Sequence, residues 1–303
     1  MTELTLLQQK MVAFSTTCQV KINEPMRAHT SFRIGGGAEI MAFPKTAEEL
    51  ADVLHFCAEN GVKPLILGAG TNVLAPDVGL QGVVICLKDG LDGMQRLDGN
   101  RIRVLSGVTM TRAAVFAANQ GLSRLEFAHG IPGTVGGGVY MNAGAYGGEI
   151  KDVAETVDVM DLQGNIRTFT RDEMEFSYRH SVLEGKAYIV LSAVFSLQPA
   201  EPEAVKAKMR ELQAKRSASQ PLDLPSAGSA FKRPVGGYAA ALIQDAGLKG
   251  YRVGDAAIST KHAGFAVNLG NATAQDVREL LRQVSDKVFE NSGIRLEPEV
   301  RIW

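Results

Sequence analysis

The sequence predicts an α+β fold with more than one domain; two observations support this prediction, and the charge balance limits the function. The chain has 303 residues, of which 45% are hydrophobic and 21% charged, so it can form two or three domains with a substantial core. Helical patterns in the first two hundred residues are mixed with runs of strands, which disfavours a repeating βαβ sheet. The 32 Lys plus Arg nearly cancel the 33 Asp plus Glu, which excludes a general polyanion binder.

Helices are predicted where apolar residues recur every three or four positions. Thr46 and Glu49 form a capping box, and the following helix presents one apolar stripe made of Leu50, Val53, Leu54 and Cys57. An alanine-rich helix is predicted over 109–119. Two further amphipathic helices are predicted over 201–217 and 273–291.

Strands are predicted where β-branched residues lie between turn residues. The apolar run 64–67 indicates a short buried strand. Segments 155–162, 166–170 and 188–197 alternate in hydrophobicity, so we expect consecutive antiparallel strands there. The pattern changes at 199–202, which we interpret as a domain boundary.

Glycine is the unusual residue of this chain, because its 32 copies are clustered. Eight lie within 130–148, a second cluster is Gly68-Ala69-Gly70-Thr71-Asn72, and a third is 35–37. Glycine lets backbone N–H groups approach a diphosphate without an intervening Cβ, so two such loops in one domain predict a large anionic cofactor. The Rossmann fingerprint fails because Val73 stands where its third glycine belongs, and no P-loop motif is present. Structural glycines in tight turns are the alternative.

Two segments contain polar residues suited to binding an anion. Ser229 is preceded by glycine and followed by Lys232 and Arg233, but no Gly-x-Ser-x-Gly elbow surrounds it, which disfavours a serine hydrolase. Arg179 lies among aromatic and hydroxyl side chains in the segment 176–181. A turn serine and a structural arginine are the alternatives.

The C-terminal segment 296–303 alternates between polar and apolar residues. If extended, it places Glu297, Glu299 and Arg301 on one face, and Leu296, Val300 and Ile302 on the other. Pro298 confines such a strand to a sheet edge or to its first residues. The acidic and basic groups either pair in solvent or bind a carboxylate.

Metal chemistry, disulfides and membrane insertion are not expected. Cys18, Cys57 and Cys86 are widely spaced and form no Cys-x-x-Cys pair, so we interpret them as core or surface thiols. The five histidines show no spacing typical of a metal site. No run of eighteen uncharged apolar residues exists and no signal peptide pattern is visible, so we expect a cytoplasmic, soluble protein.

Taken together, five motifs resemble the UDP-N-acetylenolpyruvoylglucosamine reductase (UDP-N-acetylmuramate dehydrogenase) family, in its shorter subgroup. The resemblance covers about residues 20–303 and keeps the family's order, which argues against chance agreement. The motifs are the 68–72 loop, Ile131-Pro132-Gly133-Thr134-Val135-Gly136-Gly137 with Asn142-Ala143-Gly144-Ala145-Tyr146-Gly147, Tyr178-Arg179, Gly228-Ser229-Ala230-Phe231-Lys232, and Leu296-Glu297-Pro298-Glu299-Val300-Arg301.

This resemblance implies a two-subdomain p-cresol methylhydroxylase-type FAD-binding fold plus a C-terminal α/β substrate-binding domain. The implied domains are an N-terminal helical segment at 1–20, an FAD-binding domain at 21–199 and a substrate-binding domain at 200–303. The FAD-binding domain divides into about 21–98 and 99–199, and the terminal segment 296–303 returns to the active site.

The implied activity is the FAD-dependent reduction of UDP-N-acetylglucosamine enolpyruvate to UDP-N-acetylmuramate in peptidoglycan precursor synthesis. The resemblance implies non-covalent FAD, and NADPH as the co-substrate that uses the substrate site in turn. The implied partners are therefore small molecules, with no nucleic acid and no membrane insertion, and a monomer is favoured over an oligomer.

The resemblance also assigns residues to tasks. Arg179 neutralises the developing negative charge, Ser229 donates the proton, and Glu299 is the second catalytic residue, with Glu299 as the acid itself left open. Substrate-binding residues are Tyr178, Lys232, Lys261 and Arg301. Flavin-binding residues are Gly68, Ala69, Gly70, Thr71, Asn72, Gly130, Ile131, Pro132, Gly133, Thr134, Gly136, Gly137, Asn142, Ala143 and Gly144; no metal site is implied.

Two departures from the family pattern lie beside the implied flavin. His129 and Gly138 stand where the family usually has a small residue and an alanine. Because His129 lies in a flavin loop, an oxidase of the same fold with covalent flavin is one alternative. A non-catalytic nucleotide-binding protein is the other.

Overall fold

The computed structural model describes residues 3–88 and 90–303, and its contacts divide the chain into two compact units. The first unit comprises residues up to 22, 39–69 and 82–214, and the second comprises 23–38, 70–81 and 215–303. The domain boundaries predicted at residues 20, 98 and 199 remain a proposal.

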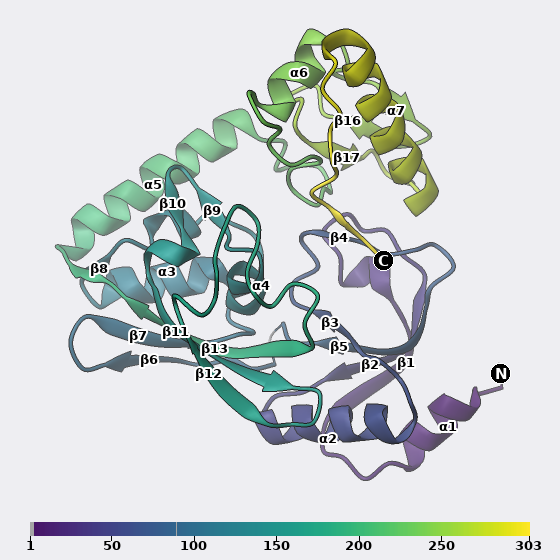
Figure 1. The fold of residues 1–303 in the computed structure, drawn as a ribbon, viewed down its shortest axis with the longest axis vertical. Coiled ribbons are helices and arrows are strands. Elements are labelled where there is room, and N and C mark those ends of the chain that lie inside the picture. Colours follow the sequence, from purple (N-terminus) through teal and green to yellow (C-terminus); the bar gives the residue numbers. More distant parts are fainter. Residues whose placement is uncertain (1–2, 89) are drawn as a thin grey trace. The chain divides into compact units, whose positions relative to one another are not determined.

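A four-stranded sheet of order β1-β2-β5-β3 lies largely in the first unit (Figure 1). Its strands and helices are α1 (Leu6–Ala13), β1 (Gln19–Pro25), β2 (Gly37–Phe43), α2 (Ala47–Glu59), β3 (Leu65–Leu67) and β5 (Leu80–Cys86). The predicted N-terminal helical segment contains α1, while its residues Met1 and Thr2 lie outside the described residues.

Helix α2 forms where the capping pattern predicted it. The Thr46 hydroxyl accepts the N–H of Glu49, and the predicted stripe of the helix is buried in a core cluster shared with β2 and β5. The Glu49 carboxylate accepts the N–H of Lys45, one residue earlier than the capping box predicts.

A five-stranded antiparallel sheet of order β12-β11-β13-β7-β6 forms the second part of the first unit. Its strands are β6 (Met94–Leu97), β7 (Arg101–Leu105), β11 (Ala154–Asp161), β12 (Ile166–Thr170) and β13 (Tyr188–Ser196). The prediction of antiparallel strands is confirmed, but β13 pairs with β11 and not with β12, its neighbour in sequence. Strand β13 is almost fully buried and is the most apolar of the five, in keeping with its place in the middle of the sheet, whereas β11 is buried at half of its positions.

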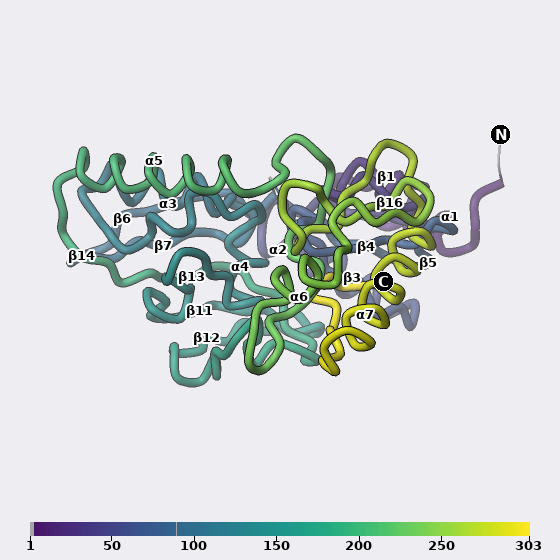
Figure 2. Tube along the Cα trace, turned by 90° about the horizontal axis from the view of Figure 1, so that it is seen from above, coloured from purple at the N-terminus to yellow at the C-terminus, as the bar shows by residue number. Residues whose placement is uncertain are grey.

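Helices and short elements cover one face of this sheet. They are α3 (Met110–Asn119), β8 (Leu122–Ser123), η2 (Glu126–Ala128), α4 (Val135–Tyr140), β9 (Gly144–Ala145), β10 (Gly148–Glu149), η3 (Ile150–Asp152), β14 (Gln198–Pro199) and α5 (Pro202–Ser219). Buried residues of α3, α4 and the start of α5 share one core cluster with β7, β11 and β13. Figure 2 shows α5 as one long helix, of which the residues up to Ala214 belong to the first unit.

The second unit packs α7 (Ala274–Ser292) against a small antiparallel sheet of order β15-β16-β17. Its elements are η1 (Met26–Ala28), β4 (Val73–Leu74), α6 (Ala239–Asp245), β15 (Arg252–Val253), β16 (Ala256–Ile258), β17 (Ala266–Asn268), α7 and β18 (Arg301–Ile302). Thr273 caps α7 through a capping box with Asp276, and the predicted apolar face of the helix is buried.

The C-terminal segment departs from the predicted strand. Only Arg301 and Ile302 form a strand, parallel to β4, while Pro298 makes an isolated bridge to Phe231. Because the segment changes partner between these positions, the predicted pleat is not kept. Ile302 is consequently 41% exposed and does not share the buried face of Leu296 and Val300.

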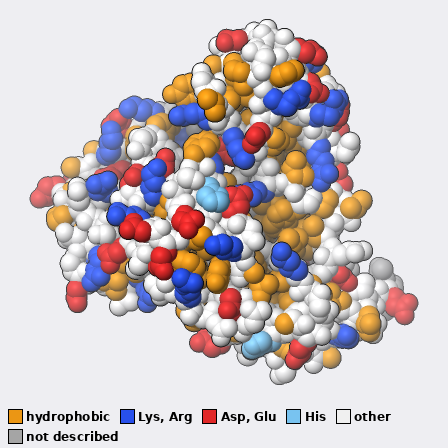
Figure 3. Space-filling view, viewed as in Figure 1, with side chains coloured by type: hydrophobic (Ala, Val, Ile, Leu, Met, Phe, Trp, Pro, Cys, Tyr) orange, Lys and Arg blue, Asp and Glu red, His pale blue; other side chains and the backbone are white. Residues whose placement is uncertain are grey.

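The three cysteines are all buried. Burial raises the pKa of Cys18 to about 11 and that of Cys57 to about 12. The face shown in Figure 3 carries charged side chains of both signs, in keeping with a formal net charge of -1. Among residues 3–88 and 90–303, no helix is long and apolar enough to cross a membrane.

Candidate functional site

The glycine-rich segment after η2 is fixed by bonds to the protein itself. The Thr134 hydroxyl accepts the N–H of Gly137 at 3.3 Å and so caps α4. Val135 and Gly136 donate their N–H groups to the carbonyl groups of Val108 and Ser106 at 2.8 and 2.9 Å. The start of α4 is therefore held against the segment that precedes α3.

The glycines of α4 differ in what they are needed for. A Cβ on Gly136 would lie 2.9 Å from the Ser106 Cβ, and a Cβ on Gly138 would lie 2.7 Å from the Met110 Sδ. For Gly137, the nearest atom would be the Thr134 Oγ1 at 3.6 Å, an ordinary contact. Gly137 is exposed, so packing within the described protein does not require glycine there.

The Gly138 departure has a packing reason. The Met110 side chain occupies the space into which an alanine methyl group at 138 would project. Flexible methionine fills irregular gaps of this kind in protein cores.

The two predicted flavin loops meet in the first unit. A Cβ on Gly68, which follows β3, would lie 2.6 Å from the Thr134 Oγ1. The absence of a side chain at Gly68 therefore lets the first loop touch the cap of α4. This contact supports the expectation that both loops serve one ligand.

Two buried polar atoms beside these loops lack hydrogen-bond partners. Within residues 3–88 and 90–303 there are four such side-chain atoms, and they include the Ser106 Oγ and the His129 Nδ1. Ser106 is fully buried against Gly136, and burial lowers the pKa of His129, which favours the neutral imidazole. A buried polar atom without a partner indicates that a ligand or water completes it. Sequence reasoning missed Ser106, since a serine after a strand reads as an ordinary turn residue.

The residues that follow α4 form a polar cluster around Asn142. The Asn142 Nδ2 donates to the Glu149 Oε2 and to the Ser177 carbonyl, both at 2.9 Å, and its Oδ1 accepts the N–H of Lys151 at 3.0 Å. The Lys151 Nζ lies 2.9 Å from the Glu149 Oε2. Glu149 and Lys151 were not predicted; Gly144, where a Cβ would lie 2.7 Å from the Glu149 Cγ, was the available signal that a side chain crosses this hairpin.

Glu149 is held in its charged form. Burial raises the pKa of its carboxyl, but hydrogen bonds from Lys151 and Asn142, together with the charges of Lys151 and Arg179, outweigh burial and lower it overall. The carboxylate is thus negative at neutral pH and faces two cations.

Arg179 lies at the tip of a tight turn. Ser177 and His180 exchange backbone hydrogen bonds at 3.1 and 3.2 Å, which leaves Tyr178 and Arg179 between them. Arg179 has φ +54°, its Nη2 lies 3.5 Å from the Gly144 carbonyl oxygen, and its guanidinium carbon lies 5.2 Å from the Tyr178 ring centroid. A left-handed backbone in a non-glycine residue is frequent at functional sites.

The second unit brings Ser229 and Glu299 to neighbouring backbone positions. Ala230, the residue after Ser229, accepts the N–H of Glu299 at 2.9 Å and donates its own N–H to the Gly264 carbonyl at 2.8 Å. The Asn72 Nδ2 donates to the Glu299 carbonyl at 3.3 Å, and the Asn72 carbonyl accepts the N–H of Arg301 at 2.9 Å. The predicted flavin residue Asn72 therefore supports the backbone on both sides of Val300.

The predicted substrate-binding cations already have protein contacts. The Lys232 Nζ lies 3.3 Å from the Glu297 Oε2, in an exposed pair. The Lys261 Nζ donates to the Ser217 carbonyl at 2.7 Å, near the end of α5, which gives Lys261 a structural contact. Arg301 is half-buried in β18.

The predicted site residues are thus distributed between the two units. Residues 68, 69, 130–134, 136, 137, 142–144, 178 and 179 belong to the first unit. The second unit contains 70–72, Ser229, Lys232, Lys261, Glu299 and Arg301.

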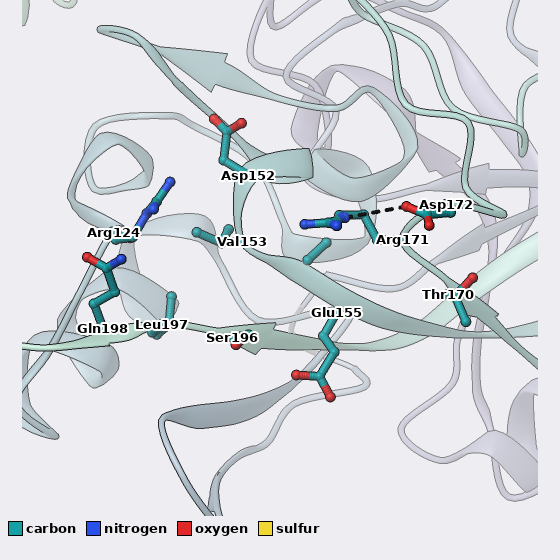
Figure 4. Close-up of a pocket in the computed structure, with 11 residues that line it drawn as sticks. Arg124, Asp152, Val153, Glu155, Thr170, Arg171, Asp172, Ser196, Leu197 and Gln198 are labelled. Atoms are coloured by element: carbon teal, nitrogen blue, oxygen red, sulfur yellow. Dashed lines mark ion pairs between the residues drawn. The ribbon is translucent and has the colours of Figure 1, made fainter.

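A hollow elsewhere in the first unit contains none of the predicted residues. Its volume is about 480 Å³, and its walls carry both charge signs, including the pair Arg171 and Asp172, 3.6 Å apart (Figure 4). The hollow lies at the ends of β11, β12 and β13, so we do not assign it to the reaction.

Comparisons with known proteins identify both parts of the chain. Residues 38–170 match an FAD binding domain, and residues 220–303 match the C-terminal domain of UDP-N-acetylenolpyruvoylglucosamine reductase. A relative from Lachnoclostridium phytofermentans with that name is 44% identical over 98% of this chain and 97% of its own length. One from Listeria monocytogenes is 45% identical over 93% of this chain and 94% of its own length.

Solved structures agree with these matches. The crystal structure of UDP-N-acetylenolpyruvylglucosamine reductase from Thermus caldophilus covers 95% of this chain and 100% of its own, with 35% identity and a TM-score of 0.80. An alkyldihydroxyacetonephosphate synthase covers 65% of this chain and 41% of its own at 16% identity and a TM-score of 0.50, a likeness of fold alone.

These findings confirm the predicted fold class, a p-cresol methylhydroxylase-type FAD-binding fold followed by a C-terminal domain typical of the recognised family. They also confirm FAD as the cofactor. The chain belongs to the UDP-N-acetylenolpyruvoylglucosamine reductase family.

Proposed function

We propose that this chain reduces UDP-N-acetylglucosamine enolpyruvate to UDP-N-acetylmuramate, using FAD and electrons from NADPH, in peptidoglycan precursor synthesis. The observation that carries the proposal is family membership along 98% of the chain, at 44% identity to a named reductase. A cytoplasmic location and a monomeric state are part of the proposal. NADPH as the electron donor is also part of it. A nicotinamide cofactor that occupies the substrate site in turn with the substrate needs no Rossmann domain.

The first unit has features that fit a flavin nucleotide. No other described residue crowds the exposed Gly137, which leaves room for a ligand. The buried Ser106 Oγ and His129 Nδ1 have no hydrogen-bond partner within the described part of the protein. We propose that Gly68, Ala69, residues 130–134, Gly136 and Gly137 hold the cofactor, together with Gly70 and Thr71 of the adjoining loop. When bound, FAD supplies the hydride from its N5 to the β carbon of the enolpyruvyl group.

The proposed task of Arg179 is to bind the substrate carboxylate. Hydride addition at the β carbon leaves a carbanion at the α carbon, and the adjacent carboxylate spreads that charge. A guanidinium stabilises the resulting dianion through two parallel N–H donors. The strained backbone of Arg179 is consistent with a side chain that is held in place for this task.

The proposed task of Ser229 is to protonate the α carbon. A serine hydroxyl is a weak acid, and it can serve here because the carbanion is far more basic. Glu299 is proposed to orient the hydroxyl or to help stabilise the aci-carboxylate, and the backbone pairing beside Ser229 supports their joint action. Glu299 as the acid itself stays open.

Tyr178, Lys232, Lys261 and Arg301 are proposed to bind anionic or aromatic parts of the sugar nucleotide. Tyr178 is 46% exposed beside Arg179, which leaves its ring accessible. The exposed pair of Lys232 with Glu297 is weak in water, so Lys232 can exchange that partner for a phosphate.

The function is tested by two anaerobic additions to the purified holoprotein. We expect NADPH to bleach the flavin absorbance and UDP-N-acetylglucosamine enolpyruvate to restore it. UDP-N-acetylglucosamine, which lacks the double bond, is the matched control and should leave the flavin reduced. Absence of restoration by the enolpyruvyl compound would contradict the proposal.

Gly137→Ala tests the flavin position in α4. We expect the affinity for FAD to fall by about tenfold or more, because the methyl group projects where the cofactor approaches. Stability without FAD should stay equal or rise, since alanine is favoured in a helix by about 0.5–1 kcal/mol. FAD titration and chemical unfolding of the flavin-free protein measure both quantities.

Gly136→Ala is the matched control for that variant. It should destabilise the flavin-free protein by about 1–3 kcal/mol, because its methyl group meets Ser106. Unchanged FAD affinity in Gly137→Ala would place the flavin elsewhere.

Ser229→Ala should separate the two half-reactions. We expect flavin reduction by NADPH to stay nearly intact, while reoxidation by the enolpyruvyl substrate slows by about 10²–10⁴-fold. Stopped-flow absorbance measures each step, and Ser219→Ala on the exposed end of α5 is the control. Equal slowing of both steps would remove the proton-donor role.

Arg179→Lys should slow reoxidation strongly despite the retained charge, because a lysine cannot engage a carboxylate through two parallel donors. The same stopped-flow assay tests this expectation. Arg282→Lys, in an exposed ion-pair cluster on α7, is the control and should behave as the unaltered protein. Full turnover of Arg179→Lys would show that the guanidinium is structural.

A further inference from the structure

Asn142 was predicted to bind flavin, but its carboxamide is occupied by the protein. The residue is 1% exposed. A carboxamide has two N–H donors, and these go to the Glu149 carboxylate and to the Ser177 carbonyl, both at 2.9 Å. The remaining oxygen accepts the N–H of Lys151. No N–H of Asn142 is left over for a cofactor.

The bond to Ser177 connects Asn142 to the turn that carries Arg179. Ser177 begins that turn, and its backbone pairs with His180 on the other side of the tip. On the far side, the buried Ser181 donates its hydroxyl to the Tyr140 carbonyl at 2.8 Å. Asn142 and Ser181 thus tie both arms of the turn to the end of α4 and the residues just after it.

The Glu149 side chain fixes the direction of the carboxamide. Gly144 pairs with Glu149 in the β9–β10 hairpin, and a Cβ on Gly144 would lie 2.7 Å from the Glu149 Cγ. Glycine at 144 therefore lets the carboxylate cross the hairpin to reach Asn142. Because a carboxylate only accepts hydrogen bonds, it selects the orientation in which Nδ2 faces Glu149 and Ser177.

The same carboxylate belongs to the surroundings of Arg179. The Arg179 Nη2 lies 3.5 Å from the carbonyl oxygen of Gly144, the pairing partner of Glu149. Lys151 and Arg179 are the cations that face Glu149, and Asp152 is the neighbouring acid. The Glu149 carboxylate therefore accepts a hydrogen bond from the Asn142 carboxamide and also interacts electrostatically with the Arg179 guanidinium.

We infer that Asn142 is a positioning residue for Arg179, oriented by Glu149, and not a ligand of the flavin. This inference rests on the proposed function, in which Arg179 binds the substrate carboxylate. Asn142 touches no reacting atom; it acts by holding the left-handed turn in one place. Its consequence is that loss of the carboxamide impairs substrate reduction at saturating FAD.

Asn142→Asp is the principal test, because aspartate keeps the shape and tolerates a positive φ but lacks both donors. The holoprotein is examined by hydrogen exchange of the amides in 175–183, by FAD titration, and by stopped-flow reoxidation with the enolpyruvyl substrate. We expect about tenfold faster exchange in the turn, unchanged FAD affinity, and about 10²-fold slower reoxidation.

Asn165→Asp is a matched control. Asn165 is exposed in the turn between β11 and β12, where its Nδ2 donates to the Asp161 carboxylate at 3.0 Å, so the same amide–carboxylate bond is lost far from Arg179 in sequence. Exchange in 175–183 and reoxidation should match those of the unaltered protein.

Glu149→Ala keeps the test decisive if Asn142→Asp does not fold. It leaves Asn142 in place without its orienting acceptor, and we expect the same pattern with smaller amplitude. Faster exchange together with slower reoxidation at unchanged FAD affinity supports the inference. Any other pattern overturns it. Weaker FAD binding without faster exchange would show that Asn142 is a ligand of the flavin. If the enolpyruvyl substrate does not reoxidise the flavin of the unaltered protein, the proposed function is wrong. The exchange measurement still shows independently whether Asn142 anchors the turn.

Discussion

The contact between the Thr134 hydroxyl and the backbone of Gly68 is the constraint on which the first unit depends. Thr134 is buried, caps α4 through the N–H of Gly137, and lies where the turn between β7 and α3 meets the glycine loop. Gly68 can approach only because it has no Cβ. Two loops that are far apart in sequence, both within the residues that match an FAD binding domain, are thereby joined at one hydroxyl group.

Much of the fold was predictable because local signals agree with the tertiary structure. The helices predicted from residues 46, 109 and 273 begin there, each capped by a threonine, and the strands around 155–197 form one antiparallel sheet. The exchange of neighbours between β12 and β13 was not predictable, since strand order is decided by burial across the sheet. The exposed Ile302 was missed because its segment changes pairing partner after Pro298.

The candidate site was predictable by residue type and much less by role. Glycines of one cluster look alike in sequence, yet a Cβ on Gly136 or Gly138 would crowd Ser106 or Met110, while one on Gly137 would make only an ordinary contact. Asn72 and Asn142 both come from motifs assigned to the flavin, and both donate to backbone carbonyls, of Glu299 and Ser177 respectively. Such bonds arise only after distant segments meet, so no local pattern reveals them. The flavin motifs and the proposed catalytic residues are thus coupled through amide side chains.

The burial of the three thiols has a practical consequence for labelling this protein. With pKa values of about 11 and 12 for Cys18 and Cys57, these sulfur atoms stay protonated at neutral pH, and the buried Cys86 is shielded from reagents. A cysteine introduced at Val235, which is 98% exposed, would therefore take up a maleimide dye far ahead of the native thiols. The native cysteines therefore need not be replaced before the segment that precedes α6 is labelled for fluorescence measurements during turnover.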